Sequence, residues 1–468
     1  MAWKRFAPLL LAAALTALGM AQTPSPEAQL KLPQMQFTQF KLSNGLRVVL
    51  SVDHTLPVVT ESMIFDVGAR DEHKGRSGFA HLFEHLMFEG SAHAPKGTFE
   101  KLIEGYGGNF NANTHEDYTF YYTTVPSNVL ETAMWLDADR ISALNVTAAA
   151  LKNQISVVKE EKRLRMDNAP YGPLMYSAIQ EQAFSNWQNS HPVIGSFEDL
   201  DAATQHDVEE FFHQYYAPDN CVLTIVGDFD PVRTKAMVEH YFGWIPDRSK
   251  ITPVDTREPE QTAPRRMTLA DAQAKLPALT MSWHGPARGT QDFYALNMLG
   301  ELLFDGDSSR LFQALVKNNP VALEVEGGLG FPMGDYSDYR APGMFAGLVV
   351  YKPNATADEV EKLVMQQIHE VEANGVPAAE MQRLRTKFSS NWIQSEQTTL
   401  SRAQLLALAT MFDGSPEKAN SELQNFMAVT PEQMAAVARK YLTSARVNVI
   451  LDQPGAAAPA AKAQGGGR

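Results

Sequence analysis

An internal repeat constrains the fold of this chain more than any other feature. Residues 56–72 read LPVVTESMIFDVGARDE, and residues 276–292 read LPALTMSWHGPARGTQD. An apolar helical run follows each segment, HLFEHLMFEGS from His81 and NMLGELLFDGD from Asn297, and both halves end in a β-type run. Similarity over such distances indicates duplication of one unit, and chance likeness between amphipathic segments is the alternative.

Each half begins with alternating strands, continues through helices and returns to a terminal strand. This order predicts an α+β fold of two homologous domains, each a mostly antiparallel sheet covered by helices. We expect a first domain at 36–245 and a second, inactive domain at 267–453. A polar segment with four prolines, 246–266, reads as their linker, and the Ala/Gly/Pro-rich tail 454–468 should be disordered.

The N-terminus has the pattern of an export signal. Lys4 and Arg5 precede 13 apolar residues, and small residues precede a cut after Ala21. A membrane anchor, the alternative, needs about 20 apolar residues. We therefore expect a signal peptide at 1–21, a leader at 22–35 and a periplasmic mature chain without a membrane span.

Charge and cysteine content exclude several classes of function. The chain has 54 acidic against 40 basic side chains, a formal net charge of −14, which argues against a nucleic-acid partner. A single cysteine excludes an intrachain disulfide and a cysteine-rich metal site. A metal must then be held by histidines and carboxylates.

The run HLFEHL has the spacing of a metal-binding helix. His81 and His85 lie one turn apart on one face, so both imidazoles can point at one cation such as zinc. Glu84 lies on the same side, close enough to reach a water on the metal without binding the metal itself. Satisfied core histidines are the alternative.

A catalytic zinc needs a third protein ligand from another element. The helical stretch LKNQISVVKEEKRLR offers two adjacent acids, Glu160 and Glu161, of which only one can face the metal. We take Val157, Val158 and Leu164 as the packed side of this helix, which favours Glu161. A solvated charged face is the alternative for this pair.

With these residues in place, the chain resembles the pitrilysin/insulinase family of zinc metallopeptidases, whose inverted H-x-x-E-H is a known catalytic motif. It is most similar to the short, two-domain bacterial and mitochondrial-processing-peptidase-like members. The resemblance covers about residues 36–453. It implies one Zn²⁺ held by His81, His85 and Glu161, with Glu84 as the general base that hydrolyses a peptide substrate. The spacing of 75 residues between His85 and Glu161 matches the family pattern.

A second family motif is present as GGNFNANTHEDYTFYY from Gly107. The resemblance implies that Asn109, Phe110, Asn111 and Ala112 belong to an edge strand that pairs with an extended substrate, and free strand edges do bind peptides this way. A glycine turn entering an aromatic strand is the plainer alternative.

Two departures from the family concern the site. Relatives often carry an acid at the position of Gln154. The amide of Gln154 can still form an outer hydrogen bond to the site, but it brings no negative charge. Active relatives also carry an Arg and a Tyr in the other domain, where this chain has Val316 and Leu323. We therefore expect a partner, a homologous subunit without the zinc motif, to supply that pair. The second half itself has Asn297, Gly300 and Glu301 at the positions of His81, Glu84 and His85.

These observations predict a zinc-dependent endopeptidase that encloses peptides or unfolded segments in a chamber. One rival is a non-catalytic scaffold or chaperone-like subunit that keeps the fold, which loss of a motif residue would favour. A weaker rival is a plain zinc-binding protein, which more often shows His-rich loops.

Overall fold

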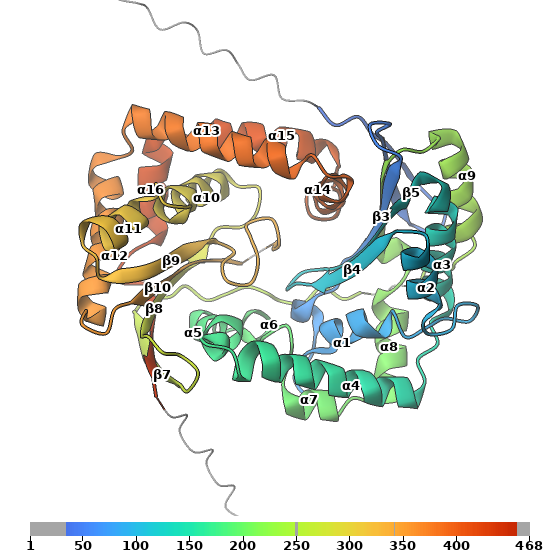
Figure 1. Cartoon of the computed structure of the whole chain (residues 1–468), viewed down its shortest axis with the longest axis horizontal. Helices are drawn as coiled ribbons and strands as arrows, with labels where there is room; N and C mark the ends of the chain where they lie inside the picture. The colour runs from blue at the N-terminus through green and yellow to red at the C-terminus, as the bar shows by residue number, and fades with distance from the viewer. Residues whose placement is uncertain (1–33, 249–250, 341, 456–468) are drawn as a thin grey trace, which may run out of the picture. The chain divides into compact units, whose positions relative to one another are not determined.

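The structure is a computed structural model that describes residues 34–248, 251–340 and 342–455. The predicted signal peptide, most of the leader and nearly all of the predicted tail lie outside the described residues. Two β-sheets with sixteen α-helices around them form the described part of the chain (Figure 1). This is the α+β architecture that the repeat predicts.

The first sheet has six strands in the order β1-β2-β6-β3-β5-β4. The strands are β1 (Thr38–Lys41), β2 (Arg47–Val52), β3 (Val58–Phe65), β4 (Asn109–Thr114), β5 (Thr119–Pro126) and β6 (Cys221–Gly227). Only β2 and β6 pair in parallel, and every other neighbouring pair is antiparallel. Strand β4 therefore lies at one edge of the sheet, and among the described strands it pairs with β5 alone.

The helices of the first half lie between β3 and β6 in the sequence or follow β6. They are α1 (Phe79–Leu86), α2 (Thr98–Gly105), α3 (Leu130–Ala143), α4 (Ala148–Lys162), α5 (Ile179–Ala183), α6 (Trp187–Ser190), α7 (Phe197–Asp201), α8 (Gln205–Tyr215) and α9 (Pro231–Phe242). Apolar residues of α1, α3, α8 and α9 join those of the sheet in one buried core. This core covers one face of the first sheet.

The second sheet repeats the topology with five strands, in the order β7-β11-β8-β10-β9. The strands are β7 (Arg265–Asp271), β8 (Ala278–Gly285), β9 (Ala322–Leu329), β10 (Gly343–Tyr351) and β11 (Asn448–Pro454). Strand β11 lies between β7 and β8 and pairs in parallel with β7 and antiparallel with β8. Strand β6 pairs with β2 and β3 of the first sheet in the same way. The shared order is the structural signature of the duplication, and β1 is an addition to the first copy.

The second half also carries its own helices. They are α10 (Gln291–Phe304), α11 (Arg310–Phe312), α12 (Ala357–Asn374), α13 (Ala378–Ser395), α14 (Thr399–Phe412), α15 (Glu417–Met427) and α16 (Pro431–Tyr441). In the part of the chain that is described, no helix is both long and apolar enough to cross a bilayer.

Each half covers part of the other half's sheet. Helix α14 packs on β3 and β6 of the first sheet, where the hydroxyls of Thr60 and Thr399 lie 2.7 Å apart. Helix α5 of the first half packs on β8 and β11 of the second sheet. Its first residue, Ile179, and the preceding Leu174 share a core with Met344 and Ile450. The central strands of both sheets are therefore buried on two faces, which explains why β3 and β10 are almost wholly inaccessible.

Candidate metal centre and active site

Helix α1 carries the H-x-x-E-H run and begins at Phe79, after Gly78 in the left-handed region at φ 83°. Its apolar residues Leu82, Phe83 and Leu86 are buried in the first core. The opposite face therefore carries the polar side chains toward a cavity of about 480 Å³. The cavity lies between α1, β4 and the end of α4.

Three predicted ligands converge in this cavity. The ligand atoms of His81, His85 and Glu161 all lie within 4.8 Å of one another. Glu161 Oε2 is 3.7 Å from Nε2 of His81 and 3.4 Å from Nε2 of His85. Among the residues that the structure describes, no other group of three or more His, Cys, Asp or Glu side chains meets this test.

The donor set and its spacing fit zinc. Tetrahedral zinc with bonds of about 2.0–2.2 Å to nitrogen and oxygen separates its ligand atoms by about 3.3–3.6 Å, close to the two distances from Glu161. The rings of His81 and His85 meet edge-on with centroids 4.9 Å apart, so that neither blocks the other. The side chains are 13% (His81), 22% (His85) and 18% (Glu161) exposed, so the site is sheltered but reachable.

Burial and the neighbouring charges act differently on the three predicted ligands. Burial, reinforced by the neighbouring His85, lowers the pKa of His81 to about 4, so this imidazole is neutral at physiological pH. Burial also opposes charge on His85, but its contacts with Glu161 and Glu84 outweigh burial and raise its pKa. The hydrogen bond from His85 holds the pKa of Glu161 below its usual range.

Glu84 lies in the same cavity but outside the ligand cluster. Its Oε2 accepts a hydrogen bond of 2.6 Å from the hydroxyl of Thr114, the last residue of β4. Burial raises the pKa of Glu84, which makes the carboxylate a better proton acceptor. Thr114 belongs to the Gly-Gly motif, so the sequence did contain the signal for this contact.

The structure corrects the packing argument that selected Glu161. Only Val158 of the three supposed core residues is buried, whereas Val157 is 42% and Leu164 62% exposed. Glu161 nevertheless faces the histidines, and Arg165 holds its other oxygen, Oε1, at 3.1 Å. Glu160 lies outside the cluster and pairs with Arg163.

Gln154 lies beside the cluster, on the same face of α4 as Glu161 and two turns before it. Its Nε2 donates to Oε1 of Glu89 at 2.5 Å, and a hydrogen bond with His85 helps to raise the pKa of that histidine. Glu89 in turn pairs with Lys96 at 2.5 Å. The amide therefore connects His85 to a buried carboxylate that the sequence did not point to.

The predicted substrate strand is β4, at the free edge of the first sheet. Asn111 and Ala112 line the cavity, whereas the side chain of Phe110 packs on Phe88 and Phe99 and Asn109 is exposed to solvent. Sequence reasoning missed other lining residues because they come from distant segments, namely Tyr176, Val193, Ile194, Pro332 and Met333.

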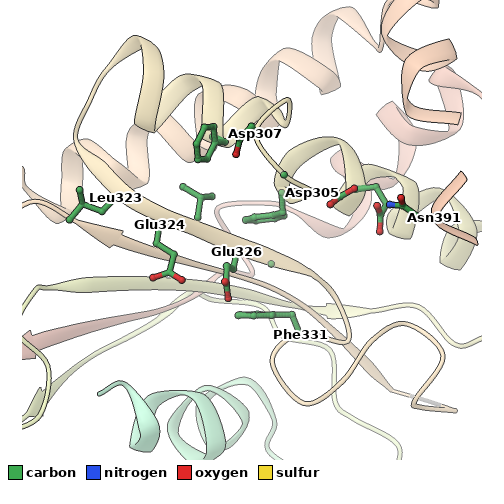
Figure 2. Close-up of a pocket in the computed structure, with 13 residues that line it drawn as sticks. Asp305, Asp307, Leu323, Glu324, Glu326, Phe331 and Asn391 are labelled. Carbon is green, nitrogen blue, oxygen red and sulfur yellow. The ribbon is translucent and has the colours of Figure 1, made fainter. Parts of the chain in front are cut away.

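A cavity of about 610 Å³ occupies the equivalent place in the second half (Figure 2). Helix α10 and β9 line it, as α1 and β4 line the first cavity. Glu301 stands where the first half has His85, and burial together with the adjacent Asp305 raises its pKa to about 8. Val316 is half-buried, and Leu323 lines this second cavity at 51% exposure.

Comparison with known proteins gives a consistent result. A family model described as "Insulinase (Peptidase family M16)" matches residues 47–196, and one described as "Peptidase M16 inactive domain" matches residues 202–388. The zinc protease PqqE of Helicobacter pylori is 24% identical over 433 residues, 92% of this chain and 95% of that protein. The uncharacterized zinc protease YmxG of Bacillus subtilis is 23% identical over 422 residues, 89% of this chain and 98% of that protein.

Solved structures share the fold. A protease from Helicobacter pylori superposes with a TM-score of 0.84 at 23% identity, covering 90% of this chain and 100% of that chain. The periplasmic protease PqqL from Escherichia coli gives a TM-score of 0.73 at 15% identity, covering 91% of this chain but 48% of that chain.

Proposed function

Because this chain belongs to the insulinase family of peptidases, M16, we propose that it is a zinc-dependent endopeptidase whose zinc is held by His81, His85 and Glu161. The observation that carries the proposal is the convergence of three ligand atoms from α1 and α4 beside a carboxylate, Glu84, that stays outside the cluster. A scaffold that had lost catalysis would have no need to keep all four side chains in one cavity.

The chain's own residues would divide the reaction between them. A zinc ion bound by the three ligands would supply Lewis acidity, acidifying a water and polarising a peptide carbonyl. Glu84 takes the proton of the attacking water and then delivers it to the leaving amine. Thr114 orients the Glu84 carboxylate for both steps. The free edge of β4 holds the peptide in extended form through main-chain hydrogen bonds.

Two further parts of the proposal concern assembly and location. A homologous partner subunit supplies the Arg and Tyr that Val316 and Leu323 replace, and the two subunits enclose a chamber for short or unfolded peptides. The match to only 48% of PqqL supports this, because that chain has room for two units of this size. The signal-like N-terminus and the periplasmic location named for PqqL support export to the periplasm.

One experiment tests the function. Purified mature chain is assayed for bound zinc and for cleavage of a mixed peptide library, with and without homologous subunits encoded by the same organism. We expect zinc at one ion per chain and cleavage that a partner raises. A chain that binds zinc but cuts nothing with any partner would favour the scaffold.

Glu84→Gln separates the base from the metal site. The amide keeps the size of the side chain and can still accept from Thr114, but it cannot take up a proton. We expect zinc content to be unchanged and kcat to fall by about 10²–10⁴-fold, as is typical for loss of a general base. Full activity in this variant would exclude Glu84 as the base.

A further inference from the structure

The N-terminus of the active-site helix has no cap of its own. Gly78 occupies the N-cap position and has no side chain to accept from the first amides of α1. Those amides have no partner within a helix, and leaving them unpaired in a buried place is costly. His81 lies in this same first turn, so whatever fixes the turn also fixes the first metal ligand.

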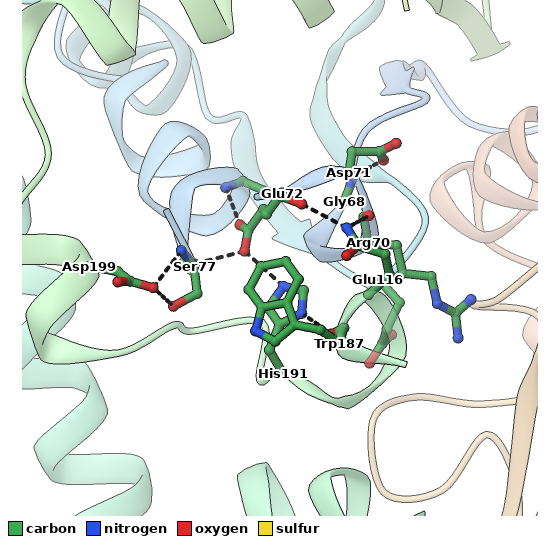
Figure 3. A network of polar contacts seen from close by, with 12 residues as sticks. Gly68, Arg70, Asp71, Glu72, Ser77, Glu116, Trp187, His191 and Asp199 are labelled. Atoms are coloured by element: carbon green, nitrogen blue, oxygen red, sulfur yellow. Dashed lines mark hydrogen bonds and ion pairs between the residues drawn. The ribbon is translucent and has the colours of Figure 1, made fainter. Parts of the chain in front are cut away.

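Glu72, six residues before Gly78, fills that role (Figure 3). Its Oε2 accepts from the amide of Gly78 at 2.8 Å, and its Oε1 accepts from the amide of Ala80 at 2.7 Å. The Glu72 side chain is completely buried. A carboxylate bonded to two helix amides also opposes the positive end of the helix dipole. Ala80 directly precedes His81, so Glu72 holds the backbone next to the ligand.

His191 holds Glu72 in turn. Its Nε2 lies 3.0 Å from Oε2 of Glu72, and its Nδ1 lies 2.7 Å from the carbonyl oxygen of Trp187. Both ring nitrogens thus face oxygen acceptors, and Trp187 stacks on the ring at 3.8 Å. Gln188 adds a donor to the backbone carbonyl of Glu72 at 2.8 Å. The carboxylate has little freedom to rotate away from α1.

The same segment continues into the wall of the cavity. Val193 and Ile194 line the cavity that holds the metal ligands. Gly78 packs so closely on this segment that a Cβ there would lie 2.7 Å from the carbonyl oxygen of Ile194. The cavity wall and the first turn of α1 are therefore joined through buried contacts.

We propose that Glu72 is a positioning residue for the metal ligand His81, and that His191 keeps the Glu72 carboxylate on the amides of α1. The inference rests on the proposed function, since it concerns the same metal site. Glu72 touches neither the metal ligands' ring atoms nor the cavity, so its effect passes through the backbone of Gly78 and Ala80.

Zinc affinity of the full chain, measured by competition with a chromogenic chelator, tests the proposal. Glu72→Ala should bind zinc about 10–100-fold more weakly, the usual cost of losing an outer partner of a ligand. Glu72→Gln should lose less, because its single amide oxygen can accept from one amide. His191→Gln keeps a donor toward Glu72 and should retain most of the affinity that His191→Ala loses.

Glu422→Gln is the matched control. Glu422 is a buried carboxylate of the second half that accepts from the Tyr294 hydroxyl at 3.1 Å. Its loss removes a buried charge without touching α1, so zinc affinity should stay at the wild-type value. If folded Glu72→Ala and Glu72→Gln both bind zinc with wild-type affinity, the proposal is overturned. If Glu72→Ala does not fold, the zinc affinity of Glu72→Gln is the test.

Hydrogen exchange of the zinc-free chain separates this inference from the proposed function. In Glu72→Gln, amides of α1 (79–86) should exchange faster than in the wild type, while those of α10 (291–304) should not change. Unchanged exchange in α1 would overturn the inference. A wild-type chain that binds no zinc would remove the proposed function instead, and the exchange result would still show whether Glu72 fixes α1.

Discussion

At the scale of single residues, the sequence predicted the placements that helix geometry alone determines. The spacing of His81 and His85 fixes their shared face in any α-helix, so the pair could be identified without coordinates. The choice of Glu161 rested on the expectation that Val157, Val158 and Leu164 form a packed face. Val157 and Leu164 are exposed, and the buried side of α4 is formed by Leu151 and Val158 instead. The contacts of Glu72 and Glu89 were out of reach because they depend on how separate segments fold back on α1.

The two adjacent acids of α4 give a matched pair of variants. Glu161→Gln should weaken zinc binding by more than the about 10–100-fold expected for an outer partner, because a direct ligand is lost. Glu160→Gln should have no effect, since the Glu160 side chain is 60% exposed and pairs with Arg163 rather than with the histidines. Competition with a chromogenic chelator measures the zinc affinity of both variants. Equal affinities would remove Glu161 from the ligand set.

Glu301 predicts a pH dependence of stability. Burial and Asp305 raise its folded pKa from 4.5 to about 8. Below about pH 4.5 both the folded and the unfolded chain keep the proton, so ionisation has no effect. Between pH 4.5 and 8 the unfolded chain loses the proton while the folded chain keeps it. The free energy of unfolding therefore falls as pH rises, and the loss is complete above pH 8.

Glu301→Gln should remove this loss because the amide has no proton to release. We expect the variant to gain stability over the wild type as pH rises from 5 to 8.5, at most about 1.4 kcal/mol for each pH unit. Urea unfolding at both pH values measures the difference, with Glu370→Gln on the exposed face of α12 as the control. A stability difference that is the same at both pH values would contradict the assignment.

At the scale of elements, the strand β4 was predicted from its motif, and the structure places it at a sheet edge. The motif could not say which side chains face the cavity. Phe110 packs in the aromatic cluster with Phe88 and Phe99, whereas Asn111 and Ala112 line the cavity. The amide of Ala112 donates to the side chain of its neighbour Asn111 at 2.9 Å, so it is not committed to β5.

Ala112→Pro tests the role of this edge. Proline removes the amide that an extended peptide would use, and an edge strand tolerates proline best. We expect kcat/KM for peptides to fall about 3–10-fold, the range for one net hydrogen bond, with zinc affinity unchanged. Ala112→Ser keeps the amide and serves as the control. Undiminished cleavage by the proline variant would argue against pairing on β4.

At the scale of the whole molecule, the repeat predicted both the duplication and the strand-rich start and end of each half. It did not predict that α14 packs on the first sheet and α5 on the second. A repeat shows which elements correspond, but it carries no information about which copy's helix covers which copy's sheet. That choice depends on contacts between residues hundreds of positions apart, such as Thr60 and Thr399.

Because α14 packs on the first sheet and α5 on the second, the two halves should stay associated after the chain is cut between them. A protease site inserted between Thr252 and Pro253, both exposed, would divide the chain between its two sheets. We expect the two fragments to stay together on size exclusion in native buffer and to separate in denaturant. Insertion of the same site without cleavage is the control. Fragments that separate in native buffer would show that the packing of α14 and α5 does not hold the halves together.

The packing of α14 on the first sheet also offers a reason for the presence of a second half that lacks the H-x-x-E-H run. A shortened gene product ending after β6 would leave the α14-facing side of β3 open to water, including the hydroxyl of Thr60, which is fully inaccessible in the intact chain. The proposed peptidase activity of the first copy would then also preserve the second copy, because α14 covers the first sheet. The second copy's cavity is accordingly free to change its side chains, as long as its helices continue to shield the neighbouring sheet.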